Sequence, residues 1–183
     1  MQAVIIKEKK APQRQNRVVE YPLMDIKTIN PFILAAVTVI KSATGLSVAR
    51  DNIFLQKGKF TPSGTGMTLD LHGDVKGKIV YEFSKGVAVK ISEKMIEYNL
   101  DPELTAVDFK TLLNSAILEL GNQIAGKAIT LLEKNGVNCQ ISPPKFYIGR
   151  DLQLIHPHLL TFVLSLKTEF GTFTINIALY PKE

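Results

Sequence analysis

Residues 114–126 read Asn114-Ser115-Ala116-Ile117-Leu118-Glu119-Leu120-Gly121-Asn122-Gln123-Ile124-Ala125-Gly126, and they lie within a longer helical pattern. Polar residues and a glycine recur in it every three or four positions, and so form one stripe along a helix: Ser115, Glu119, Asn122 and Gly126. At about 100° per residue, the large aliphatic residues of the same segment cluster nearly opposite this stripe. The pattern predicts an amphipathic helix whose outer face carries a carboxylate and a carboxamide one turn apart.

Polar residues on the outer face of an amphipathic helix are usually only solvated. Two features favour a docking surface here instead. Aliphatic residues lie beside the stripe at Leu118, Ala125 and Ile129, and such a mixed face is typical of a contact with another protein. Gly121 and Gly126 also weaken the helix, by roughly 1 kcal/mol each relative to alanine. Their presence indicates either close approach by another backbone or a bend.

The rest of the chain predicts an α+β domain in which helices pack with a mostly antiparallel sheet. Asn30 and Pro31 suit the start of a helix over about residues 31–44, and the stripe belongs to a helix over about residues 108–134. We also expect a short helix from Ser92 that ends before Pro102. Alternating apolar residues predict strands at 47–56, 67–72, 76–83, 87–91, 137–148, 162–166 and 173–179.

Two of these strand predictions carry further detail. Residues 87–91 are expected to pair with residues 76–83 across a turn at 84–86, and the last two strands to form a hairpin around 169–171. The strand over residues 137–148 is interrupted at Pro143-Pro144, which suits the edge or the end of a strand because proline lacks an amide hydrogen.

Composition indicates an ordinary soluble domain. The chain has 183 residues, 45% of them hydrophobic and 21% charged, which is enough for one substantial core. Its longest apolar run is too short to span a bilayer, so we expect no membrane insertion. Residues 1–23 lack the apolar segment and cleavage site of a secretory signal. The single cysteine, Cys139, suits a reducing, cytoplasmic compartment and is expected to be a small apolar filler in a strand.

The net charge of +5 is concentrated at the N-terminus. The first twenty residues carry five basic side chains against two acidic ones, so we divide the chain into a basic, flexible extension over residues 1–23 and a domain over residues 24–183. The domain lacks a basic face with aromatic residues, and we expect no nucleic-acid binding. An alternative is that the extension tethers the protein electrostatically to a membrane or a nucleic acid.

His156-Pro157-His158 is the one segment that suggests a metal site. Two ligands rarely make a site, and the chain has only one other histidine and no cysteine cluster. We therefore interpret the segment as an exposed turn and expect no metal bound by this chain.

The motif Ser115-x-x-x-Glu119-x-x-Asn122, followed about twenty residues later by Pro143-Pro144, resembles the signature of the CheC/CheX/FliY phosphatases of bacterial chemotaxis. Residues 24–32, 73–81 and 141–144 resemble, in the same order, the family's opening helix, its central hairpin strand and the strand after its signature helix. The resemblance covers about residues 24–181. CheC-type members carry a second E-x-x-N in the first helix, which residues 30–37 lack, and this points to CheX.

The resemblance implies an α+β fold with a mostly antiparallel sheet and two long helices. It also implies hydrolysis of the aspartyl phosphate of a CheY-like response regulator. Asn122 would orient the attacking water, since a carboxamide both accepts and donates while staying neutral. Glu119 would pair with the active-site lysine of the regulator. Ser115, Leu118 and Gly126 would line the contact.

The regulator would supply Mg²⁺, so we expect no cofactor bound by this chain. CheX relatives form homodimers, and the resemblance therefore implies a homodimer here. The alternative is non-catalytic, because the same fold serves in flagellar switch proteins. The chain would then be a response-regulator binder or a scaffold. A phosphatase needs Asn122, whereas a scaffold binds without it.

Overall fold

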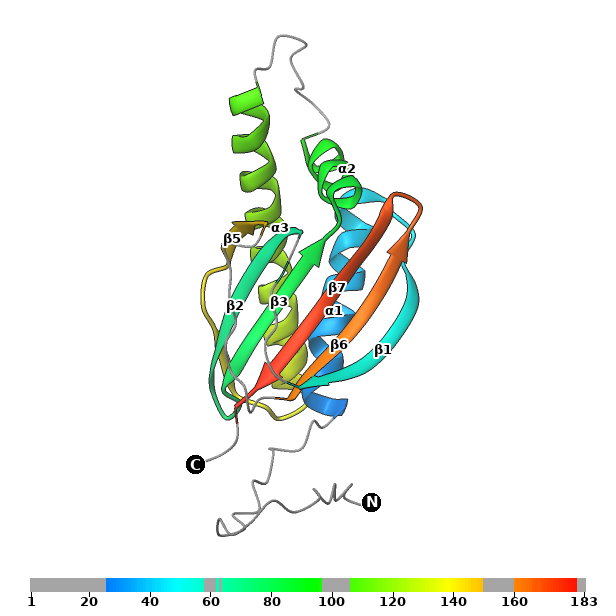
Figure 1. Ribbon diagram of the computed structural model, residues 1–183. Helices are drawn as coiled ribbons and strands as arrows, with labels where there is room; N and C mark the ends of the chain where they lie inside the picture. Colours follow the sequence, from blue (N-terminus) through cyan, green and yellow to red (C-terminus); the bar gives the residue numbers. More distant parts are fainter. Residues whose placement is uncertain (1–25, 58–61, 63, 97–105, 150–159, 181–183) are drawn as a thin grey trace, which may run out of the picture.

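The computed structural model of the chain describes residues 26–57, 62, 64–96, 106–149 and 160–180. They form one sheet in which every described pairing is antiparallel, in the order β1-β6-β7-β3-β2-β4, with β5 also paired to β2 (Figure 1). The strands are β1 (Ala49–Lys57), β2 (Thr65–Gly73), β3 (Gly77–Phe83), β4 (Cys139–Ile141), β5 (Lys145–Ile148), β6 (Leu160–Thr168) and β7 (Gly171–Leu179).

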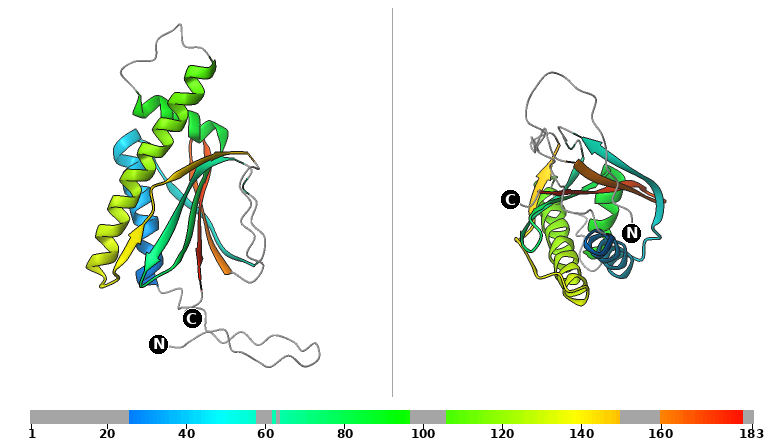
Figure 2. Two further views of the ribbon diagram at one scale, coloured as in Figure 1. Left: turned by 90° about the vertical axis from the view of Figure 1, so that its left-hand side faces the viewer. Right: turned by 90° about the horizontal axis from the view of Figure 1, so that it is seen from below.

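Three helices cover one face of this sheet: α1 (Ile26–Thr44), α2 (Lys85–Met95) and α3 (Ala106–Lys134) (Figure 2). The α+β class with two long helices is therefore confirmed. The two long helices lie side by side and run in opposite directions. The core lies between the helices and the sheet, where fully buried side chains include Phe32, Leu69, Tyr81, Ile117, Leu120 and Phe173. None of the described helices is long and apolar enough to cross a membrane.

Helix α1 begins at Ile26, five residues before the start predicted at Pro31. Pro31 lies inside the helix, where it lacks the amide hydrogen that would normally donate to the carbonyl of Lys27. The side-chain amide of Asn135, just after α3, donates to that carbonyl at 2.9 Å. A contact between distant segments thus satisfies the carbonyl oxygen, and it joins the start of α1 to the end of α3.

Residues 85–95 form α2, so the prediction of a strand over residues 87–91 is wrong. The alternation of Val87, Val89 and Ile91 suggested a strand, but the buried positions are Val87, Ala88, Ile91 and Ser92, which follow a helical repeat. The partner of β3 on that side is β7, which joins it in continuous register from Gly77–Leu179 to Phe83–Phe173. The helix predicted to begin at Ser92 overlaps only the last turn of α2, and its predicted continuation after residue 96 lies outside the described residues.

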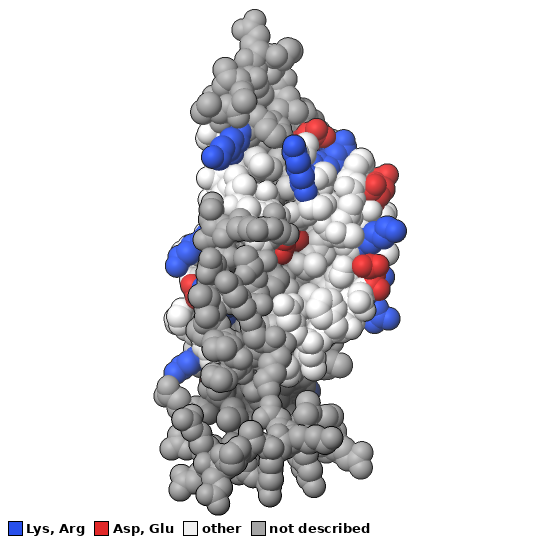
Figure 3. Space-filling model, viewed as in Figure 1, with Lys and Arg blue, Asp and Glu red and all other residues white. Residues whose placement is uncertain are grey.

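The other elements agree with the prediction. The β6–β7 hairpin turns at residues 169–170, and the strand broken at Pro143-Pro144 appears as β4 and β5. Cys139 is a buried filler in β4, and burial raises the pKa of its thiol. Residues 1–23 and the histidines of 156–158 lie outside the described residues. In the view of Figure 3, the described basic and acidic side chains are interspersed and do not form one basic face.

Candidate functional site

The predicted stripe lies on the solvent side of α3. Ile117, Leu120 and Ile124 are fully buried against the sheet. On the opposite side of the helix the stripe residues are all exposed: Ser115, Glu119, Asn122 and Gly126. A carboxylate and a carboxamide therefore project into solvent from a rigid helix that is anchored along its other face.

Fewer of the aliphatic residues beside the stripe reach the surface than the sequence predicts. Leu118 and Ile129 are half-buried, but Ala125 is only 8% exposed and belongs to the core. Ala125 lies one turn after Gly121, on the side of α3 that packs against β4 and β5. Its expected place on the docking surface is therefore wrong, because a second set of strands covers that side of the helix.

The carboxylate of Glu119 has a neighbour that the sequence analysis did not single out. The side-chain amide of Gln123 donates to Glu119 Oε1 at 2.9 Å. Gln123 lies four residues after Glu119, and this spacing was the signal that could have identified the pair. The hydrogen bond uses one carboxylate oxygen and orients the group along the helix, while the second oxygen has capacity for a cation from solvent.

The two glycines of the stripe region have different surroundings. A Cβ atom added to Gly121 would lie 2.9 Å from Cβ of Pro144 and would also collide with the sulfur of Met67. Close packing of α3 on the sheet therefore requires a glycine at this position. A Cβ atom at Gly126 would meet nothing within 4 Å, so this glycine leaves bare backbone on the exposed face.

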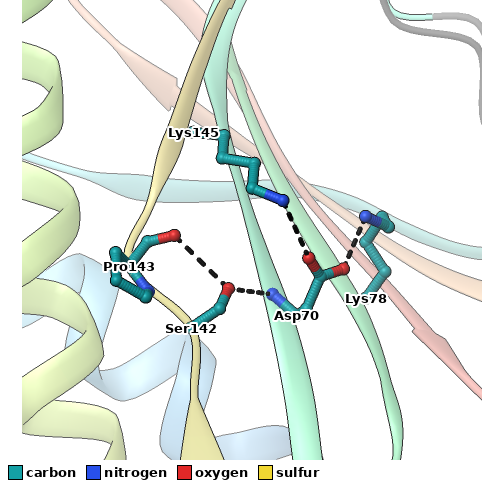
Figure 4. Close-up of polar contacts among 5 residues, drawn as sticks. All are labelled: Asp70, Lys78, Ser142, Pro143 and Lys145. Atoms are coloured by element: carbon teal, nitrogen blue, oxygen red, sulfur yellow. Dashed lines mark hydrogen bonds and ion pairs between the residues drawn. The ribbon is translucent and has the colours of Figure 1, made fainter.

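Pro144 lies in an irregularity of the sheet, and Figure 4 shows its neighbours Ser142, Pro143 and Lys145. Leu71 pairs with Ile141 and Thr68 with Lys145, so two residues of β2 oppose three residues of the other chain segment. Ser142 fills the gap: its backbone amide donates to the Asp70 carbonyl at 2.9 Å, and its hydroxyl accepts from the Asp70 amide at 2.9 Å. The hydroxyl in turn donates to the Pro143 carbonyl at 3.3 Å.

The side chain of Asp70 forms ion pairs with Lys78 and, at 3.6 Å, with Lys145 (Figure 4). Burial raises the pKa of Asp70, but the hydrogen bonds and charges of the two lysines outweigh it and hold the pKa below its ordinary value. Asp70 alternates with the core residues Leu69 and Leu71, so the cluster lies on the face of the sheet away from α3. Its ion pairs connect β2 to β3 and to the start of β5, next to the bulge that carries Pro144.

The described residues contain no group of three or more histidine, cysteine, aspartate or glutamate side chains that could hold a metal. The candidate site is an exposed carboxylate–carboxamide pair, Glu119 and Asn122, on a helix of an α+β domain. A carboxylate can bind a cation, and a carboxamide can accept a hydrogen bond from water or donate one to it.

Comparison with known proteins identifies the family to which this domain belongs. A sequence model described as "Chemotaxis phosphatase CheX" matches residues 65–165. The CheY-P phosphatase CheX of Thermotoga maritima is 30% identical over 134 residues, which cover 72% of this chain and 81% of that protein. The chain belongs to the CheX family.

Solved structures agree on the fold. The chemotaxis protein CheX from Desulfovibrio desulfuricans superimposes with a TM-score of 0.72 at 21% identity, covering 85% of this chain and all of that one. CheX in the CheX–CheY–BeF3–Mg²⁺ complex from Borrelia burgdorferi superimposes with a TM-score of 0.62 at 24% identity, covering 83% of this chain and 97% of that one.

Proposed function

We propose that this protein is a phosphatase that hydrolyses the aspartyl phosphate of a CheY-like response regulator in the cytoplasm. Its family, together with the name of the Thermotoga relative, supports the activity. The observation that carries the proposal is the exposure of Glu119 and Asn122 on one stripe of α3, about one turn apart. Both groups are available to a protein surface that docks on this helix.

In this mechanism Asn122 orients a water molecule in line with the phosphorus atom. The water oxygen bonds to phosphorus while the bond from phosphorus to the aspartyl oxygen breaks. The products are inorganic phosphate and a free carboxylate, and the proton of the water passes to phosphate or solvent. A carboxamide suits this role because it accepts from and donates to water without changing charge.

Glu119 pairs with the active-site lysine of the regulator and so sets the docking register. One of its oxygens accepts from Gln123, and the other meets the lysine. Ser115, Leu118 and Gly126 line the contact. Mg²⁺ belongs to the regulator, so this chain would supply the groups that orient the water and the regulator, and no metal.

We further infer that two copies associate through β1. Among the described strands, β1 pairs only with β6 and forms an edge of the sheet. Its successive residues Ile53, Phe54 and Leu55 are 43%, 44% and 52% exposed, and successive side chains of a strand point to opposite faces. Apolar surface on both faces of an unpaired edge favours pairing with a second chain.

The test of the activity is the rate of phosphate loss from phosphorylated CheY-like regulators of the same organism, with wild type and with Asn122→Ala. We expect wild type to accelerate the loss and Asn122→Ala to lower kcat by about 100-fold or more, within the range seen when a key polar group is removed. The variant should still bind the regulator loaded with beryllofluoride. If wild type binds regulators but accelerates none of them, the protein is a binder or scaffold and the proposal is overturned.

A further inference from the structure

Helix α1 exposes an apolar side chain beside the candidate site. Leu34 is 53% exposed, more than any other large hydrophobic side chain among the helix residues whose burial is described. The outward face of α1 continues around it with Asn30, Thr38 and Lys41, all of them exposed. This face points away from the sheet, as the stripe of α3 does, because the buried sides of both helices pack on the core.

The contact between Asn135 and Lys27 sets the register of the two antiparallel helices. Lys41 is fourteen residues after Lys27, or about 21 Å along α1 at the usual helical rise. The same rise counted back from Asn135 reaches about position 121 of α3. Lys41 is therefore level with Glu119 and Asn122.

The same count places Leu34 level with about position 128 of α3, near the bare backbone of Gly126. With the usual 8–10 Å between packed helices, Leu34 lies roughly 13 Å from Asn122. A standard interface of about 800 Å² per partner reaches roughly 16 Å from its centre. A protein surface that docks on Glu119 and Asn122 thus also covers Lys41 and Leu34.

The charge of this face fits an acidic partner. The charged side chains described on the outward face of α1 are Lys27 and Lys41, both of them exposed, and α1 carries no acidic residue. A phosphorylated protein surface is anionic, so this basic face attracts it, while Glu119 selects one cation within it.

We propose that the docking surface for the phosphorylated regulator extends from α3 onto α1, with Lys41 as a charged contact and Leu34 as an apolar anchor. The inference rests on the proposed function. It assigns to the regulator an acidic group near its reactive lysine and an apolar side chain that meets Leu34, roughly 13 Å from Asn122 by the same helical geometry. These α1 residues bind the substrate protein and take no part in the chemical step.

The experiment uses the regulator that wild type dephosphorylates, and compares two pairs of variants. Leu34→Ser is matched by Phe170→Ser in the β6–β7 hairpin, because both changes replace a large apolar side chain that is exposed, by 53% and 38% respectively. Lys41→Glu is matched by Lys167→Glu on β6, because both lysines are exposed and the change in net charge is the same. KM and kcat are measured for each variant, with the dissociation constant for the beryllofluoride-loaded regulator and the oligomeric state by sedimentation.

We expect Leu34→Ser and Lys41→Glu each to raise KM and the dissociation constant about tenfold, with kcat unchanged. The two control variants should stay within about twofold of wild type. If Leu34→Ser and Lys41→Glu bind the regulator as tightly as their controls, this inference is overturned while the proposed function stands. A loss of dimer without a loss of regulator affinity also overturns it, because α1 would then be a self-association surface. If wild type neither binds nor dephosphorylates any regulator, both proposals fail.

Discussion

Gly121 lies against Pro144 so closely that a Cβ atom at position 121 would be only 2.9 Å from Cβ of the proline. The glycine is between Glu119 and Asn122 in sequence, and the proline is part of the bulge that Ser142 closes against β2. The turn of α3 that carries the candidate site is thus in direct contact with the sheet.

This contact makes a prediction about two glycines of one helix. Gly121→Ala should lower the free energy of unfolding by about 1–3 kcal/mol, because the added methyl group collides with Pro144 and Met67. Gly126→Ala should raise it by up to about 1 kcal/mol, since alanine favours the helix and its Cβ meets no other atom. Urea denaturation measures both. Equal shifts of the same sign would show that Gly121 has no close contact.

Asn135 is predicted to stabilise the chain by donating to the Lys27 carbonyl. Asn135→Ala should cost about 1–2 kcal/mol, because it removes this hydrogen bond. The cost should shrink in a Pro31→Ala background, where residue 31 regains an amide hydrogen that can donate to the same carbonyl. A double-mutant cycle by denaturation measures the coupling. Additive effects would contradict the shared acceptor.

Gln123 should have a small effect on catalysis. Gln123→Ala removes the hydrogen bond to Glu119, which is worth only about 0.2–0.5 kcal/mol for an exposed pair one turn apart. We therefore expect KM to change by no more than about twofold, an amount that corresponds to this energy. Steady-state phosphate release measures it. A tenfold loss would mean that Gln123 itself contacts the regulator.

Asp70 should make the stability of the protein depend on pH at the acid end. Its pKa is lowered in the folded protein from an ordinary value of 3.8, so it contributes stability above that pH, and the contribution is lost as the pH falls through the folded pKa. The difference in unfolding free energy between wild type and Asp70→Asn should be largest near neutral pH and should decrease below about pH 4. A difference independent of pH would exclude the ion pairs as its cause.

From the exposed edge of β1 we predict that the protein is a dimer. Phe54→Lys places a charge on the exposed edge, where lysine discourages strand pairing. We expect wild type to sediment as a dimer and Phe54→Lys as a folded monomer with unchanged secondary structure. Lys90→Ala on α2 serves as a control that leaves the edge intact. A monomeric wild type would contradict the prediction.

The elements that the sequence predicted well are those whose pattern reflects burial on one side. Helix α3 buries Ile117, Leu120 and Ile124 and exposes the stripe, so its period was readable, and a family signature lay within it. The alternation of Val87, Val89 and Ile91 predicts a strand, but over so short a segment Val87 and Ile91 also fit the four-residue spacing of a helix. In the folded chain β7 pairs with the edge of β3 on which residues 87–91 were expected, and these residues form a helix.

Tertiary contacts explain what the sequence could not show. Asn30 and Pro31 predict a helix start, but the helix begins earlier because the carbonyl of Lys27 is satisfied by Asn135, more than a hundred residues away. The collision that requires glycine at position 121 depends on Pro144 and Met67, which only the folded chain brings there. The level of Lys41 along α3, which we infer from the helical rise, likewise depends on how α1 and α3 pack.

The two proline residues after β4 also bear on how many copies of the chain can join. Among the described residues, β4 and β5 form the margin of the sheet opposite β1. Pro143 and Pro144 offer no amide hydrogen there, and the charged Lys145 follows at once, so an incoming strand finds no continuous ladder to extend. A sheet that can pair with a second chain at β1 but not at β4 and β5 can extend by one further chain only. If two copies pair through β1 as proposed, we expect growth by sheet extension to stop at two chains and not to continue into a fibre.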